Sequence, residues 1–239
     1  MRKKFLMLVL LSCCGLALQA QSLWTAIDVE KKINKQCSAS FELEHRSFQQ
    51  SFSSERLAST FGLEYEINKY LKTDVSYSFI YRQTQDELTK KGNLVPAYWS
   101  PRHRGNLSLT ASYKWKKRIE ISLRENYQYT YRYQMFVPKY NELGFRIPYE
   151  EVDEKHKHIL KSRLEIKYDI KKSPFEPYLS CEPYVELTDF YVEKIRYTIG
   201  TTYKINKKHR LEAYYRYINH SDEDEQAGSV FGLGYKFKF

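Results

Sequence analysis

After its first twenty residues the sequence has no long apolar run. No later segment approaches the ~18 consecutive apolar residues that a membrane-spanning helix needs. Glycine and proline are also scarce, at 9 and 7 of 239 residues, while a hydrophobic content of 42% excludes a disordered chain. If the protein lies in a membrane, it must therefore cross it with strands.

Cysteine is scarce too, with four residues, of which Cys13 and Cys14 lie in the N-terminal segment. Cys37 is an even number of residues away from apolar neighbours such as Phe41, and so is Cys181 from Leu179, which puts each cysteine on the same side of a strand as these neighbours. Both are expected on the apolar face of non-adjacent strands, where the geometry of a disulfide cannot form. The sequence therefore predicts no disulfide.

The N-terminal segment has the layout of a secretory signal peptide. A basic start, Met1-Arg-Lys-Lys4, precedes an apolar run from Phe5 to Leu11 and a small-residue exit that ends at Ala20. The apolar run is too short to span the ~30 Å hydrocarbon core as a helix. We expect a signal peptide over residues 1–20 and one mature domain over residues 21–239. Leu18 is not an ideal residue before the cut, so the exact cleavage site stays open.

Aromatic residues are abundant, with 22 Tyr and 13 Phe, yet the mean hydropathy of −0.66 is that of a polar protein. The two facts fit together if apolar and polar residues alternate, because strict alternation puts them on opposite faces of a strand. The segment from Arg56 to Ile67 does this, with Leu57, Phe61 and Tyr65 on one parity. At least nine further segments repeat the pattern.

The opposite face is too charged for a packed core. The charged residues of this face that we expect around a lumen are Glu42, Glu44, Arg46, Glu64, Glu66, Arg82, Arg124, Arg163, Glu165, Arg196, Glu212 and Arg216. Tyr and Trp near the strand ends are typical of the aromatic girdles of a membrane barrel. This favours an all-β fold, a transmembrane antiparallel up-and-down β-barrel, over a soluble sandwich or a lipocalin-like barrel.

Connections predict how many strands there are and how they are oriented. Short lysine-rich turns such as Trp115-Lys-Lys-Arg118 alternate with mostly longer polar links, as in outer-membrane barrels. Eleven strand segments can be counted, whereas bacterial barrels normally have an even number. Either residues 23–33 are not a barrel strand or a long loop hides another strand, so we expect about 10–12 strands. The acidic stretches Glu150–Glu154 and Asp222–Glu225 are expected at solvated loop tips.

The sequence resembles an uncharacterised family of outer-membrane proteins, domain of unknown function 2490. The resemblance covers nearly the whole mature chain and rests on the order and spacing of short segments. These are Leu23-Trp24, Asn34-Lys35, Phe41-Glu-Leu-Glu-His-Arg46, Gly62-Leu-Glu-Tyr65, Asn68-Lys-Tyr-Leu71, Arg102 with Arg104, and Arg124-Glu125. It implies a barrel in the outer membrane of a Gram-negative cell and no known activity.

One constellation could carry catalysis. His45 and Ser47 lie two residues apart on the lipid side of one strand, and Glu55 has suitable parity near the next. A base and a nucleophile oriented by an acid could hydrolyse lipids of the outer leaflet. The simpler interpretation is a rim histidine beside a loop serine, so a non-enzymatic protein is favoured and the lipid hydrolase is the alternative. His156 and His158 lack a nearby third ligand, and we expect neither a metal nor a cofactor.

The remaining function classes are a structural barrel, a binding platform and a narrow channel. A barrel of about ten strands encloses little space, and crowded interior charges predict a largely plugged lumen. The net charge of +10 does not indicate nucleic acid, because the lysines cluster at turns. We expect a monomer in contact with outer-membrane lipids. The terminal strand, with Tyr235, Phe237 and Phe239, is similar to the signal that the outer-membrane assembly machinery recognises.

Overall fold

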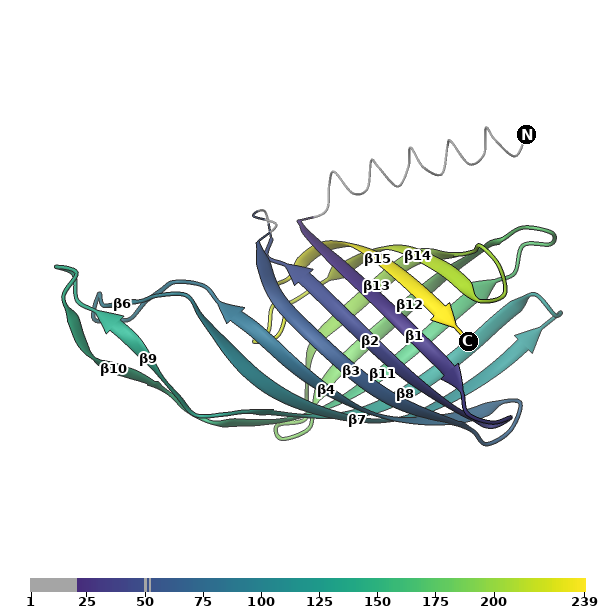
Figure 1. The fold of residues 1–239 in the computed structure, drawn as a ribbon, viewed down its shortest axis with the longest axis horizontal. Helices are drawn as coiled ribbons and strands as arrows, with labels where there is room; N and C mark the ends of the chain where they lie inside the picture. Colours follow the sequence, from purple (N-terminus) through teal and green to yellow (C-terminus); the bar gives the residue numbers. More distant parts are fainter. Residues whose placement is uncertain (1–20, 50, 52) are drawn as a thin grey trace.

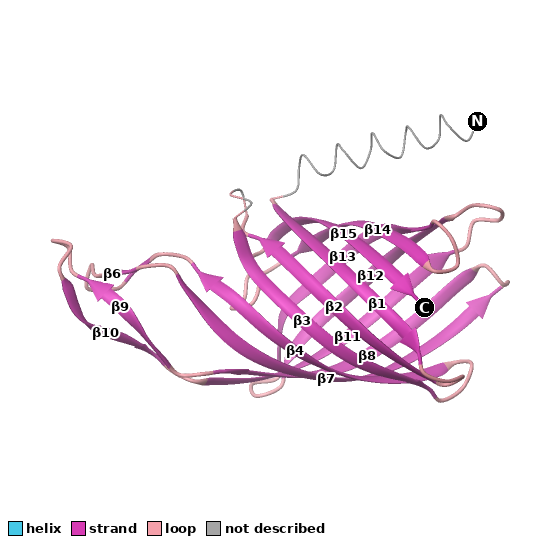
Figure 2. Cartoon of the chain, in the orientation of Figure 1, coloured by secondary structure: helices cyan, strands magenta, loops and turns pink. Residues whose placement is uncertain are grey.

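The computed structural model describes residues 21–49, 51 and 53–239; the predicted signal peptide lies outside them. Eleven strands of this described part form one closed barrel (Figures 1 and 2). In chain order they are β1 (Ser22–Lys32), β2 (Cys37–Ser47), β3 (Ser54–Glu66), β4 (Leu71–Thr84), β7 (Tyr98–Trp115), β8 (Ile119–Arg132), β11 (Lys155–Tyr168), β12 (Phe175–Glu186), β13 (Tyr191–Lys204), β14 (His209–Ile218) and β15 (Gly228–Lys238). The fold class is as predicted.

A parallel pair of strands closes the barrel. β1 pairs with β2 in the antiparallel sense but with β15 in the parallel sense, with Trp24 opposite Gly232. A ring of strands that are all antiparallel needs an even number, so eleven strands require one parallel pair. Residues 22–32 are therefore a barrel strand, and no hidden strand is needed to balance the count.

The two ends of the barrel differ. Turns such as 33–36 and 205–208 define the short-turn end, where β15 also finishes. At the other end, here called the long-loop end, the two long links contain strands of their own: β5 (Glu87–Leu88), β6 (Leu94–Val95), β9 (Met135–Tyr140) and β10 (Arg146–Val152). These form a four-stranded sheet in the order β10-β9-β6-β5, which projects beyond the barrel (Figure 1). The links 83–100 and 135–155 are thus partly ordered as strands.

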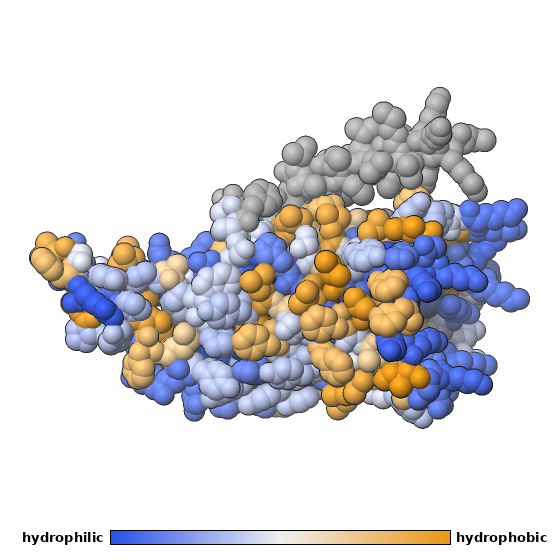
Figure 3. All heavy atoms as spheres, viewed as in Figure 1, coloured by the Kyte–Doolittle hydropathy of each residue, from blue (hydrophilic) through white to orange (hydrophobic). Residues whose placement is uncertain are grey.

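The outer surface of the barrel is apolar. Large hydrophobic side chains on alternating positions are exposed there, including Leu43, Phe61 and Leu107, each of which exposes 45% or more of its surface. Orange patches run along the barrel strands in the space-filling view, while the short-turn end is blue (Figure 3). This distribution suits an apolar surrounding such as lipid. None of the described residues forms a helix that could cross a membrane.

Glycine on the inner face makes room for a tyrosine. A Cβ built on Gly232 of β15 would lie 1.9 Å from the ring of Tyr214, which pairs with it on β14. No side chain can replace the hydrogen of Gly232 while the ring stays where it is. The tyrosine therefore lies flat against the wall.

Candidate functional site

The interior of the barrel holds a polar cavity of about 400 Å³. Nine of the twelve predicted lumen residues line it: Glu42, Glu44, Arg46, Arg124, Arg163, Glu165, Arg196, Glu212 and Arg216. The other three are not part of the lining. Glu64 pairs with Lys72 across 2.7 Å, Arg82 pairs with Glu55 across 3.0 Å, and Glu66 is exposed at the end of β3.

Ion pairs link the charges of the wall across neighbouring strands. Glu182 of β12 accepts from Arg163 Nε of β11 at 2.9 Å and lies 3.5 Å from Arg196 Nη1 of β13. Arg56 Nε lies 3.2 Å from Glu44. Buried charges need such partners, because each loses its hydration. Five further charged residues of the lumen were not predicted, although each lies at a position where the alternation of its strand puts charged residues: Arg56, Arg104, Lys161, Glu182 and Lys194.

The loop between β14 and β15, residues 219–227, forms a compact turn. Asp222 Oδ1 accepts hydrogen bonds from the backbone N–H groups of Asp224 and Glu225, at 2.9 and 2.7 Å. Asp at the start of a turn commonly bonds the backbone two residues on. Gln49 Nε2 also donates to the Ala227 carbonyl at 2.5 Å. The loop is therefore held in one shape by its own sequence and by the neighbouring link.

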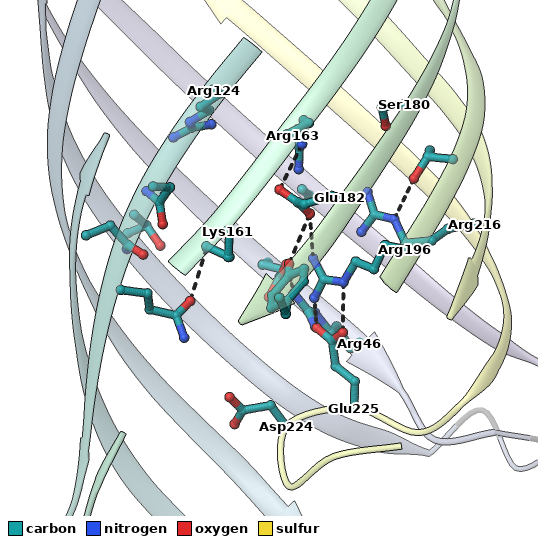
Figure 4. A pocket seen from close by; sticks show the side chains of 18 of the residues that line it. Arg46, Arg124, Lys161, Arg163, Ser180, Glu182, Arg196, Arg216, Asp224 and Glu225 are labelled. Carbon is teal, nitrogen blue, oxygen red and sulfur yellow. Dashed lines mark hydrogen bonds and ion pairs between the residues drawn. The ribbon is translucent and has the colours of Figure 1, made fainter. Parts of the chain in front are cut away.

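The carboxylates of this acidic loop point into the lumen. Asp222, Asp224 and Glu225 line the cavity, and Figure 4 shows Glu225 reaching from the loop toward Arg46 and Arg196. Glu225 is only 3% exposed. The prediction that Asp222–Glu225 is a solvated loop tip is wrong, because the cations of the wall draw the acidic run inward.

Cations on several strands bind the loop carboxylates. The two oxygens of Asp224 accept separately from Arg102 at 2.6 Å and Arg104 at 2.8 Å, both on β7. Glu225 accepts from Arg46 of β2 at 2.5 Å, and from two nitrogens of Arg196 of β13.

A buried lysine joins two of the loop acids. Lys194 of β13 is 2% exposed and lies 2.5 Å from Asp222 and 3.1 Å from Glu225. Glu223, at the rim, pairs with Lys155 at 2.5 Å. All four acidic residues of the loop are thus paired with the wall.

The surroundings shift the pKa values of the loop acids. Burial alone would raise the pKa of Asp224, but the positive charges of Arg104 and Arg102 outweigh it, and the pKa lies well below the ordinary value. The pKa of Glu223 is also lowered, since the hydrogen bond from Lys155 and its charge outweigh burial. Both carboxyl groups stay ionised at neutral pH, and each is stabilised by its cations.

Aromatic rings fix the arginines of this site. The guanidinium carbon of Arg46 lies 3.6 Å from the centroid of the Trp24 ring, and that of Arg196 lies 4.5 Å from the Tyr184 ring. Trp24 is 4% exposed and faces the lumen. A cation over an aromatic face gains electrostatic attraction and loses freedom to move. The arginines are held in place by more than their carboxylate partners.

The structure does not join His45, Ser47 and Glu55 into one hydrogen-bonded set. His45 Nε2 contacts Ser54 Oγ at 3.0 Å, and Glu55 pairs with Arg82. Ser47 is 1% exposed, and its Oγ accepts from the Leu23 N–H at 2.8 Å. The register of β2 against β3 shifts here, because Arg46 pairs with Arg56 and Ser47 pairs with Ser54, which leaves Glu55 as an extra residue on β3.

Two further sequence features have contacts on the outer face. Glu125, which interrupts an apolar face, accepts from Ser162 Oγ at 2.5 Å, with no bulge in the β8–β11 register. On β15, Tyr235 OH bonds His209 Nδ1 at 2.6 Å, and Phe237 stacks on the same imidazole. Within the described ranges, no group of three potential ligands is placed to hold a metal ion.

Comparisons with known proteins agree with this architecture. The profile of a family described as "Protein of unknown function (DUF2490)" matches residues 21–228. No curated protein sequence matches significantly.

Two solved structures are similar in fold. The β-domain of the Bordetella autotransporter Brka is 13% identical, with a TM-score of 0.57, and the match covers 85% of this chain and 82% of that one. The NanC porin is 12% identical, with a TM-score of 0.55, and the match covers 92% and 95%. Both are β-barrels of the outer-membrane type, and at this identity they show the fold alone.

Proposed function

The chain belongs to the DUF2490 family, and on that premise we propose that it is a narrow outer-membrane channel that the acidic loop keeps closed. The observation that carries the proposal is the set of buried ion pairs between Asp222, Asp224 and Glu225 and the cations of the wall. A loop that only connects two strands at the surface would not place its carboxylates in the lumen.

The size of the barrel supports a narrow pathway. Eight strands leave an interior that side chains fill, and sixteen or more enclose an open aqueous channel. Eleven strands lie between these limits, and mostly charged and polar side chains line the cavity that remains beside the loop. One of the similar structures is described as a porin. Displacement of the loop would extend the cavity toward the long-loop end.

The proposal is tested by single-channel recording in planar bilayers. Wild-type protein is expected to be almost silent. The double variant Asp224→Asn/Glu225→Gln keeps the size and the turn of the loop but removes two charges that bind it to the wall, so it is expected to conduct in long openings.

Glu223→Gln is the matched control, because Glu223 pairs with the half-exposed Lys155 at the rim. It is expected to stay as silent as the wild type. Heat-modifiable migration in detergent gels verifies that each variant forms a barrel. A folded double variant with no conductance above that of the wild type would refute the channel.

A further inference from the structure

Three cations of the long-loop half of the lumen depend on the acidic loop for their ion pairs. In the described part of the chain, Arg102, Arg104 and Lys194 form ion pairs with loop carboxylates alone. Three others each form one ion pair with a carboxylate of the wall and one with a carboxylate of the loop: Arg46, Lys157 and Arg196. Without the loop acids, this half of the lumen would carry a strong excess of positive charge.

The cations are arranged as two separate anion sites. In the first, Arg102 holds one oxygen of Asp224 and Arg104 holds the other. In the second, Arg46 and Arg196 contact Glu225 Oε1, while Arg196 Nε and Lys194 contact Oε2. Arginine matches carboxylate and phosphate oxygens in this paired way, with geometric specificity as well as charge. Each site is therefore built for an anionic group.

The two sites face one cavity. Asp224 and Glu225 both line it, together with Arg104 and Arg196. The cavity beside them, of about 400 Å³, lies within the usual range of small-molecule sites. A ligand that reaches both sites needs at least two anionic groups.

Three of the arginines also have contacts that do not involve the loop. Arg46 is held by the Trp24 ring and by Glu44 at 2.8 Å, and Arg196 is held by the Tyr184 ring. Arg104 Nε donates to Thr130 Oγ1 at 3.0 Å. The buried Nε groups of Arg46 and Arg102 have no hydrogen-bond partner among the described residues. Arg46, Arg104 and Arg196 therefore have partners on the wall as well as on the loop, and Arg46 and Arg102 each have an unused donor.

We infer that the long-loop half of the lumen binds a solute with two or more negative charges, a polycarboxylate or a phosphorylated compound, in the positions that Asp224 and Glu225 now occupy. The acidic loop then acts as an internal competitor, and the solute opens the lumen by replacing it. The inference rests on the proposed function and gives the channel its substrate class.

The test is calorimetric titration of the detergent-solubilised protein with inorganic tripolyphosphate. The Asp224→Asn/Glu225→Gln variant is expected to bind it at least tenfold more tightly than the wild type, because its loop no longer competes. Adding Arg104→Gln to this variant should weaken binding at least tenfold, whereas Glu223→Gln should bind as the wild type does. Citrate in place of tripolyphosphate distinguishes carboxylate from phosphate ligands.

A second readout avoids dependence on the variants. Excess tripolyphosphate added to the wild type should speed cleavage after Glu225 by a glutamate-specific protease, while spermine, a polycation of similar size, should not. Equal affinity of wild type and loop variant, or equal effects of tripolyphosphate and spermine, would overturn the inference.

Conductance separates the two proposals. A loop variant that conducts but binds neither polyanion leaves the channel intact and removes the anion site. A variant that binds tripolyphosphate but does not conduct keeps the site and removes the channel.

Discussion

Arg46 Nη1 donates to Glu225 Oε1 across 2.5 Å, and the two residues are 179 positions apart in the sequence. The bond connects β2, near the start of the barrel, to the last loop before β15. Both side chains are buried, with 7% and 3% of their surface exposed. The contact therefore joins the acidic loop to the wall in a place from which water is largely excluded.

Replacing either partner should loosen the loop. Arg46→Met leaves Glu225 with Arg196 and Lys194, so we expect the free energy of loop opening to fall by at most about 3 kcal/mol, the lower end for breaking a buried pair. Amide hydrogen exchange at Asp224 and Glu225, whose N–H groups bond Asp222, measures this opening. The double variant Arg46→Met/Glu225→Gln should lower the free energy of loop opening by less than the sum of the two single variants. Strict additivity would show that the pair does not interact.

The closed state should persist to acidic pH. The pKa of Asp224 is lowered in the bound loop, where Arg104, Arg102, Lys194 and Lys157 face it. Because the bound loop holds its proton less tightly than a released loop, this stabilisation is complete above the ordinary Asp pKa of about 3.9. It is lost as the pH falls through the lowered value.

Bilayer recordings across a pH series check this. Wild-type protein is expected to stay closed from pH 7 to about pH 4, near the ordinary pKa of Asp, and to open in stronger acid. Opening that begins between pH 5 and 6 would point to groups other than this carboxylate.

Gly232 should tolerate no side chain. Gly232→Ala places a Cβ against the Tyr214 ring, whereas a Cβ at Gly234 of the same strand approaches Glu212 only to 3.4 Å. We expect Gly232→Ala to lower the level of folded barrel in membranes and Gly234→Ala to leave it near that of the wild type. Gly232→Ala/Tyr214→Ala should restore assembly, since the ring is removed. Heat-modifiable gel migration reports all three, and failure of the rescue would assign the defect to another cause.

The terminal aromatic should matter for assembly more than for stability. Phe239 is 53% exposed, and its ring contacts Phe237 and the Lys31 ammonium at the end of the barrel. Deleting Phe239 should reduce the amount of protein in the outer membrane, and Phe239→Trp should preserve it. Normal membrane levels of the truncated protein would contradict an assembly signal in this strand.

Alternation along the strands predicted the fold because both faces of a barrel strand are defined by a period of two. Gly232, Glu42 and Leu43 lie on the faces that their parity indicates. The same rule did not predict that Ser47 is buried, at a point where the register of β2 against β3 shifts. It could not place the acidic loop either, because the inward position of Asp224 depends on arginines more than a hundred residues away. Nor does local pattern encode the parallel closure of β1 on β15.

Digestion with a glutamate-specific protease distinguishes an acidic loop inside the lumen from one outside it. Glu142 is exposed in the turn between β9 and β10, whereas Glu225 is buried in the lumen. Mass spectrometry of the folded wild-type protein should find cleavage after Glu142 while the bond after Glu225 stays intact, and Asp224→Asn should speed cleavage after Glu225. Equal cleavage after Glu142 and Glu225 in the wild type would show that the loop lies outside the barrel and does not close the lumen.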